Sequence, residues 1–197
     1  MKIERPIDLR VQKTQEAIRS TFKEMVCEMD ASEITVKELT ERARIHRKTF
    51  YLHYTCIEAL YEELLKELAE NYFAEIDKIP CDASFTEVNR VFFTFMASQE
   101  PYMERMICTA SYHDFCNQLF TTMLIHNRTR HNPYAAFSRP EQNIINTFLS
   151  TGSLNLYRQW VQDKKTLSLE QLITLSGELF TNGITAALKE KSKHEKK

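Results

Sequence analysis

Residues 34–60 read ITVKELTERARIHRKTFYLHYTCIEAL. Thr35 is followed three positions later by Glu38, the spacing of a capping box, in which each side chain satisfies a backbone N–H group at the start of a helix. The stretch predicts a capped helix over 35–42, a turn of three or four residues and a short helix over 46–52. This order is typical of a helix-turn-helix, whose second helix enters the major groove of DNA.

The segment from Arg42 to Tyr54, RARIHRKTFYLHY, is locally basic, with four Arg or Lys, two His and no acidic residue. The whole chain has a net charge of −1, so any surface for nucleic acid must be local. Basic and aromatic side chains beside a helix N-terminus can reach phosphates and base edges. Composition alone leaves open that this segment is only a solvated face.

The 197 residues include only three glycines and five prolines, which favours long helices over many short strands. Further capping boxes are expected at Thr55–Glu58, Ser84–Glu87 and Ser168–Gln171. Pro101 and Pro140 suit the first turns of two more helices. Together with the spacing of apolar residues, these signals predict an all-α fold of about nine helices. The expected ranges are 10–29, 35–42, 46–52, 55–78, 84–98, 101–109, 111–127, 140–163 and 168–190.

The glycines are dispersed at Gly152, Gly177 and Gly183, so the chain lacks a dinucleotide-binding loop, a P-loop and a nucleophile elbow. His113 and Cys116 could share one helix face, but two further metal ligands are missing. We therefore expect no enzyme activity, no metal and no cofactor. No apolar run has the length of a signal peptide or a membrane span, so we expect no membrane association and a cytoplasmic location.

The sequence around the second helix resembles the TetR family of bacterial transcriptional regulators. Residues 49–54, TFYLHY, match the family pattern T-[LF]-Y-x-H-F, with Tyr54 in place of Phe. Lys13 and Thr14 match the basic start of the first helix, and the resemblance covers about residues 8–65. It implies a helix-turn-helix DNA-binding domain over 1–54 and a larger helical domain over 55–197 that binds an effector and dimerises.

The resemblance also assigns residues to DNA. Those expected to anchor the protein on the phosphate side are Lys13, Thr35, Lys37, Thr49, Tyr51 and His53. Those at positions that face base edges are His46, Arg47, Lys48 and Leu52. A bidentate contact from Arg47 or Lys48 to guanine is the expected source of sequence discrimination. Phe50 and Ile45 are expected to point inward.

Three residues depart from the family pattern. Arg44 stands where many members have a glycine in the turn, and His46 replaces the usual Ser or Asn at the helix start. Ile57 stands where many members have a lysine that binds phosphate, which predicts the loss of one phosphate contact. DNA affinity could therefore be modest.

The last two helices carry apolar stripes that could form a four-helix interface in a homodimer, or could fill the core of a single chain. The candidate interface residues are Phe148, Gly152, Leu156, Trp160, Leu175, Leu179 and Gly183. Such a dimer would present two reading helices to half-sites about 34–36 Å apart on a pseudo-palindromic operator.

A cluster of aromatic residues and methionines lies between residues 85 and 120, and such clusters are more often core than ligand cage. The candidates for an effector pocket are Phe92, Phe95, Met96, Tyr102, Met106 and Phe115. The resulting hypothesis is a homodimeric regulator, most often a repressor in this family, that binds double-stranded DNA and responds to a small-molecule effector. The alternative is a regulator that reads DNA poorly alone and acts through a protein partner.

Overall fold

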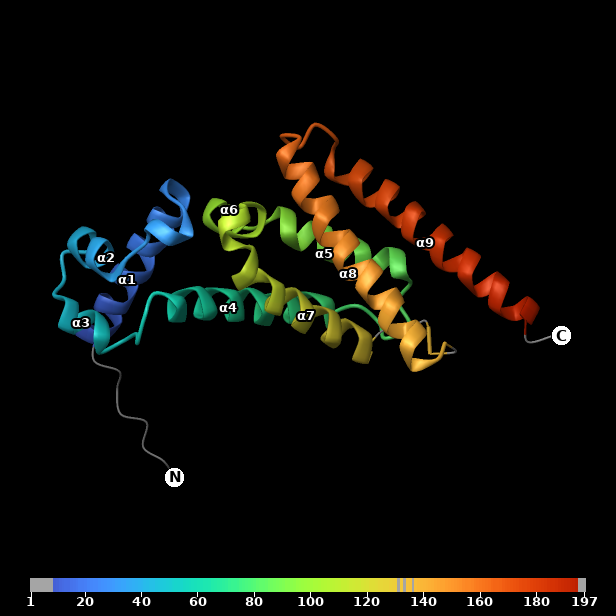
Figure 1. The fold of residues 1–197 in the computed structure, drawn as a ribbon, viewed down its shortest axis with the longest axis horizontal. Helices are drawn as coiled ribbons and strands as arrows, with labels where there is room; N and C mark the ends of the chain where they lie inside the picture. The colour runs from blue at the N-terminus through green and yellow to red at the C-terminus, as the bar shows by residue number, and fades with distance from the viewer. Residues whose placement is uncertain (1–8, 131, 133, 136, 195–197) are drawn as a thin grey trace, which may run out of the picture. The chain divides into compact units, whose positions relative to one another are not determined.

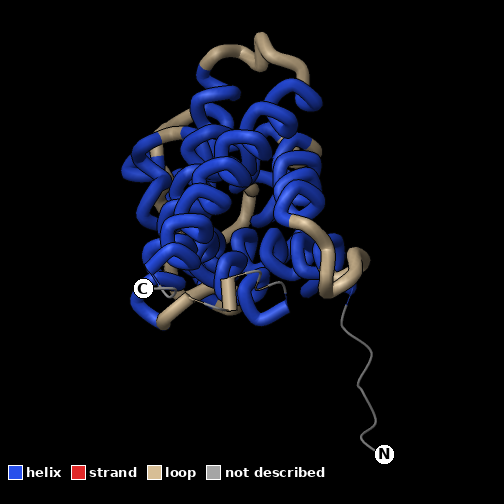
Figure 2. Tube along the Cα trace, turned by 90° about the vertical axis from the view of Figure 1, so that its right-hand side faces the viewer, coloured by secondary structure: helices blue, strands red, loops and turns tan. Residues whose placement is uncertain are grey.

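The structure is a computed structural model that describes residues 9–194 except 131, 133 and 136. Its regular secondary structure in these residues is entirely helical, which confirms the predicted all-α fold (Figures 1 and 2). The α-helices are α1 (Leu9–Glu28), α2 (Val36–Arg42), α3 (Arg47–Tyr51), α4 (Glu58–Ile76), α5 (Phe85–Ala97), α6 (Pro101–Cys108), α7 (His113–Arg130), α8 (Arg139–Gln162) and α9 (Leu169–His194). Two short 3-10 helices lie at Ala31–Glu33 and Ala110–Tyr112.

The helix starts follow the capping residues, with one exception. Thr35 and Ser84 each accept a hydrogen bond from the backbone N–H three residues later, and Ser168 does the same with Gln171. At the capping box expected for Thr55 and Glu58 the prediction was wrong, because α4 begins only at Glu58. Its first turn is closed by the hydrogen bond from Leu60 N–H to the Ile57 carbonyl. Thr55 therefore lies ahead of the helix.

The chain divides into two compact units. Unit 1 comprises residues 1–66 and 100–115, and unit 2 comprises residues 67–99 and 116–197. Unit 1 therefore contains, besides the expected DNA-binding residues 1–54, the beginning of α4 and the whole of α6. In the described residues, no helix combines the length and the apolar character needed to cross a membrane.

The core of unit 1 is built on one face of α1. Ile18, Phe22, Met25 and Val26 recur at helical spacing and have no exposed surface. Helices α2 and α6 both pack on α1, and α3 packs on α2. Tyr61 at the start of α4 meets the ring of Phe22 edge-on, with centroids 4.7 Å apart. Helix α3 is thus connected through α2 to the core built on α1.

In unit 2, helices α5, α8 and α9 pack on one another. Inside the α5–α9 contact the side-chain amide of Asn89 donates a hydrogen bond of 2.9 Å to the hydroxyl of Ser176. A hydrophobic cluster lies where α8 and α9 meet the segment before α8, and it consists of Tyr134, Phe137, Leu149 and Phe180. This packing frames the cavity described below.

Candidate functional site

The turn between α2 and α3 has the geometry of a helix-turn-helix. Ile45 N–H donates to the Thr40 carbonyl at 3.0 Å, which closes the turn onto α2. Arg44 lies at φ 54°, in the left-handed region that favours glycine. The turn therefore keeps its conformation although it carries a side chain where the family pattern has glycine.

Helix α3 is fixed by its inner face. Phe50 has no exposed surface, and its ring lies 5.8 Å from the buried ring of Tyr54. Ile45 at the turn is half-buried. The opposite face of α3 is left toward solvent, with the Tyr51 side chain 57% and the Leu52 side chain 83% exposed.

The basic residues of this face differ in how they are engaged. Arg47 and Lys48 are exposed, and no described residue forms an ion pair with either. Arg42, by contrast, forms ion pairs with Glu28 and, at 3.0 Å, with Glu38. The hydrogen bonds to Glu28 and Glu38 raise the pKa of Arg42. The charge of Arg42 is therefore paired with two carboxylates at the protein surface, whereas Arg44, Arg47 and Lys48 are exposed basic residues that form no ion pair with any described residue.

All ten residues assigned to DNA lie in unit 1, and each has an exposed or half-buried side chain. Lys13 lies on α1, Thr35 and Lys37 lie at the start of α2, and the others lie on α3 or next to it. The Thr35 hydroxyl accepts the capping bond from Glu38 N–H at 3.2 Å, so it orders α2 as well as facing solvent.

The other two departures from the family pattern also have structural consequences. His46 is the N-cap of α3 and makes no side-chain capping hydrogen bond. Ile57 is only 7% exposed and belongs to the apolar core, where an ammonium group would need to extend outward to reach water. Helix α3 thus lacks a side-chain cap at its start, and residue 57 carries no charge.

A polar network that sequence reasoning missed lies at Tyr54, just after α3. The Tyr54 hydroxyl donates to Glu63 at 3.2 Å and accepts from the Gln15 amide at 3.3 Å. Glu63 also forms an ion pair with Arg19. The two contacts made by α1, from Gln15 to Tyr54 and from Arg19 to Glu63, span 39 and 44 residues, so no local pattern could reveal them.

The candidate interface residues of α8 and α9 fall into two groups. Phe148, Leu175 and Leu179 are 53%, 49% and 56% exposed, and Gly183 is open to solvent. Trp160 is buried and donates a 2.7 Å hydrogen bond to the Leu167 carbonyl, while Gly152 packs against Phe180. Leu156 is half-buried against the hydrophobic cluster. The first group is available to a partner, whereas the second holds α8 and α9 together.

Unit 2 contains a cavity with about 760 Å³ of space, including the part open to solvent. Of the residues expected to form an effector pocket, Phe92 lines it. Phe95 packs on Tyr72 in its wall, and Met96 is fully buried in the same unit. The other three, which are Tyr102, Met106 and Phe115, belong to unit 1. Sequence reasoning missed the polar lining residues, notably Asn89, Asn127 and Asn146.

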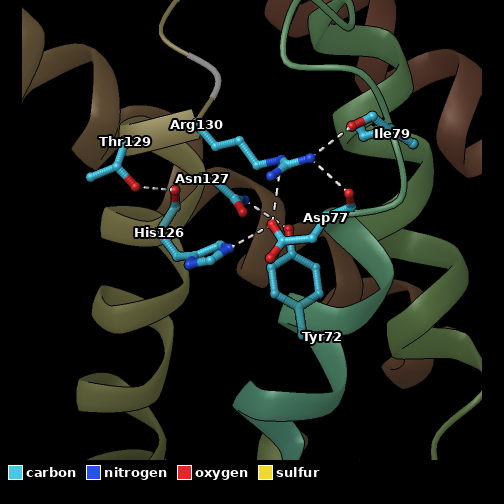
Figure 3. A network of polar contacts seen from close by, with 7 residues as sticks. All are labelled: Tyr72, Asp77, Ile79, His126, Asn127, Thr129 and Arg130. Atoms are coloured by element: carbon cyan, nitrogen blue, oxygen red, sulfur yellow. Dashed lines mark hydrogen bonds and ion pairs between the residues drawn. The ribbon is translucent and has the colours of Figure 1, made fainter.

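A polar network ties the end of α7 to the end of α4 (Figure 3). Arg130 donates to the backbone carbonyl of Asp77 at 2.7 Å, and His126 lies 2.9 Å from the Asp77 carboxylate. One residue further along α7 from His126, the Asn127 amide donates to the Tyr72 hydroxyl at 2.7 Å. Burial raises the pKa of Tyr72 to about 12, so this hydroxyl stays protonated at neutral pH. The network fixes one wall of the cavity.

Among the described residues, no group of three or more His, Cys, Asp or Glu side chains is arranged to hold a metal ion.

Comparison with known proteins places this geometry in a structural class. No protein-family model matches the chain. An uncharacterised HTH-type transcriptional regulator, YxbF of Bacillus subtilis, is 39% identical over 74 residues, which are 37% of this chain and 18% of that protein. The chain thus spans about a fifth of the length of the curated relative that it matches.

Solved structures resemble nearly the whole chain. A TetR transcriptional regulator from Streptococcus agalactiae superposes with a TM-score of 0.71 at 21% identity, covering 87% of this chain and 95% of that one. NalD, the secondary repressor of the MexAB-OprM multidrug efflux pump in Pseudomonas aeruginosa, superposes with a TM-score of 0.66 at 16% identity, covering 89% and 98%. The resemblance carried by residues 34–60 is thereby confirmed, and the chain has the all-helical fold of the TetR-type regulators.

Proposed function

We propose that the protein is a sequence-specific DNA-binding regulator of transcription in which α3 reads the major groove. The observation that carries the proposal is the face of α3, where Arg47 and Lys48 are exposed and form no ion pair with any described residue, while Phe50 anchors the opposite face. A helix fixed in this way can present the Arg47 guanidinium to guanine without the energetic cost of first breaking an ion pair with a carboxylate.

Binding to DNA tests this assignment. We would measure fluorescence anisotropy with DNA from the gene's own upstream region and with a scrambled duplex, from about 50 to 200 mM salt. The wild type is expected to prefer the native duplex and to show a steep salt slope, and the Arg47→Ala/Lys48→Ala variant to lose the preference. The control is Lys78→Ala/Arg90→Ala, which removes the same charge from exposed positions of unit 2.

Equal, weak binding of both duplexes by a folded wild type would refute autonomous sequence reading. The reading that remains is a regulator that needs a protein partner at its operator. The buried Ile57 and the internal pairing of Arg42 are the features that would weaken DNA binding in that case. The retention of a protein partner by the immobilised protein would then be measured for Arg47→Ala/Lys48→Ala and for Lys78→Ala/Arg90→Ala.

The proposal includes a homodimer that binds a pseudo-palindromic operator. Its support is the row of exposed apolar side chains on α8 and α9, with Ile144 at 72% and Leu179 at 56% exposure. Light scattering after gel filtration should give a dimer for the wild type and a monomer for Leu179→Asp. Ile125→Asp, at a 52% exposed position of α7, is the matched control and should remain dimeric.

The proposal further includes release of the operator when a small molecule binds in unit 2, so that the protein acts as a repressor. The support is the cavity of unit 2 with its predominantly apolar wall. A ligand that binds one state of the dimer better than the other shifts DNA affinity by its difference in affinity for the two states. A reporter gene under the native upstream region should be expressed more strongly when the gene is deleted.

A further inference from the structure

Three asparagines line the cavity of unit 2, and each has one buried amide atom without a hydrogen-bond partner in the described structure. These atoms are Oδ1 of Asn89, Oδ1 of Asn127 and Nδ2 of Asn146. Asn89 and Asn146 are only 2% and 4% exposed. Most buried polar groups in proteins are paired, so three unpaired amide atoms around one cavity call for an explanation.

The orientation of two of these amides follows from their other contacts. Asn89 Nδ2 donates to Ser176 Oγ at 2.9 Å, and Asn127 Nδ2 donates to the Tyr72 hydroxyl at 2.7 Å. Their oxygens are therefore left as acceptors. Asn146 contributes the complementary group, an N–H donor. The residues that line the cavity thus carry two unpaired acceptors and one unpaired donor, each shielded from water.

The rest of the lining is predominantly apolar, with aromatic rings such as Phe85, Phe92 and Phe120. Among the described residues that line the cavity, none is Asp or Glu, and Arg128 is the one with a permanent charge. A cation would meet no carboxylate in this wall and would lose its hydration there. A neutral molecule with an apolar ring system avoids that loss.

We propose that the cavity takes a ring-containing molecule that has no positive charge and carries both an N–H or O–H donor and a carbonyl-type acceptor. The donor of the molecule pairs with Asn89 or Asn127, and its acceptor pairs with the Asn146 amide. The inference rests on the proposed function, because it names the class of effector for that regulator. Pairing a group that is already desolvated gains the hydrogen bond without a further loss of contact with water.

Equilibrium dialysis with four naphthalene probes tests the ligand class. The probes are 1-naphthamide with donor and acceptor, 1-acetonaphthone with an acceptor alone, 1-ethylnaphthalene with neither, and 1-naphthylmethylamine as the cation. The wild type should bind the amide about tenfold more tightly than the hydrocarbon, with the ketone between them and the cation weakest.

The Asn146→Leu variant should abolish the advantage of the ketone over the hydrocarbon while the hydrocarbon still binds. Asn155→Leu makes the same change at an exposed position of α8 outside the cavity and should leave the order unchanged. Asn146→Leu should also melt cooperatively, which a circular dichroism melt checks.

Equal affinity for the three neutral probes, a preference for the cation, or no binding of any probe by a folded wild type would overturn the inference. Operator binding, measured separately by anisotropy, distinguishes this failure from failure of the proposed function. Intact operator binding with no probe selectivity refutes only the ligand class. Probe selectivity without operator binding refutes the regulator and leaves the cavity chemistry in place.

Discussion

Gly152 of α8 lies directly against the ring of Phe180 of α9. A Cβ atom at residue 152 would come within 2.8 Å of Phe180 Cε1, closer than side chains pack. Phe180 is only 3% exposed, and its ring meets those of Phe85 and Phe148 edge-on, each with centroids 5.6 Å apart. The close contact of α8 and α9 therefore depends on the missing side chain at residue 152.

Alanine at Gly152 and at Gly177, two of the three glycines inside helices, should have opposite effects on stability. Gly177→Ala is expected to raise the free energy of unfolding by about 0.5–1 kcal/mol, because its nearest neighbour, Thr86 Cγ2, leaves room at 3.7 Å. Gly152→Ala gains the same helix propensity but must displace Phe180. Its free energy of unfolding should therefore be about 1–3 kcal/mol lower than that of Gly177→Ala. Urea denaturation at one fixed protein concentration measures both. Equal gains would mean that the Phe180 ring moves freely.

Arg44→Gly should stabilise the helix-turn-helix. The left-handed conformation at φ 54° costs a non-glycine residue about 1–2 kcal/mol. Glycine avoids this cost, but it also gives the unfolded chain more conformational freedom, which offsets part of the gain. We expect a net gain of up to about 1 kcal/mol by urea denaturation. Arg44→Ala removes the same charge but keeps a Cβ atom, and it should show no gain. A gain from alanine as large as that from glycine would assign the effect to charge instead.

His46→Asn should strengthen the start of α3. The His46 side chain makes no capping hydrogen bond, whereas asparagine at an N-cap accepts one from a backbone N–H of the first turn. The expected gain in the free energy of unfolding is about 1 kcal/mol. His46→Ala is the control and should not stabilise. If asparagine and alanine have the same effect, the cap is not what limits α3.

Tyr134→Phe should reduce the loss of stability at alkaline pH. Burial raises the pKa of Tyr134 to about 12, above its ordinary value near 10, because the phenolate is disfavoured inside the protein. Its contribution to stability is therefore complete below pH 10 and is lost as the pH rises from about 10 to 12.

At pH 11.5 this loss amounts to about 2 kcal/mol, which the phenylalanine variant should not show. Urea denaturation at pH 8 and pH 11.5 gives the difference for each protein. Tyr51→Phe, at a 57% exposed ring, is the control and should behave as the wild type. Indistinguishable losses in wild type and Tyr134→Phe would contradict the prediction.

Lys37→Ala and Arg47→Ala should separate positioning from reading on DNA. Lys37 is exposed in the first turn of α2, where a phosphate contact would carry no sequence information. Its loss should weaken binding to operator and scrambled DNA alike and reduce the salt slope by about 0.9. Arg47→Ala should cost about 1–3 kcal/mol on the operator and much less on scrambled DNA. The reverse pattern in the anisotropy titrations would exchange the two roles.

The helices were predictable where they carried local signals. Ser84 and Glu87 are three residues apart, and the pKa of Glu87 is lowered by its hydrogen bonds to Ser84, as expected of a capping box. The same pattern failed at Thr55, where the chain after α3 has to bury Tyr54 and Ile57 before α4 can begin. Burial of two apolar side chains there outweighs the capping signal.

The residues of the proposed DNA-reading face could be named from the sequence because the stretch from His46 to His53 resembles the family pattern. Which of the basic side chains form ion pairs within the protein could not be predicted from the sequence. Arg42 pairs with Glu28, which lies 14 residues earlier on another helix, and this contact withdraws one of the four positive charges that the sequence displays. Charge counting along a segment does not register such pairing.

By itself the sequence determined the all-helical class, the order of the helices and the position of the helix-turn-helix, because caps, prolines and apolar spacing act within one or two turns. Only the tertiary structure decided how the molecule is divided, with α6 joining the unit of the reading helix, and which aromatic residues line a cavity. It also brought together Asn89, Asn127 and Asn146 from three helices. The reason is physical: a cavity wall and an unpaired amide are defined by side chains distant in sequence, whose packing no local pattern records.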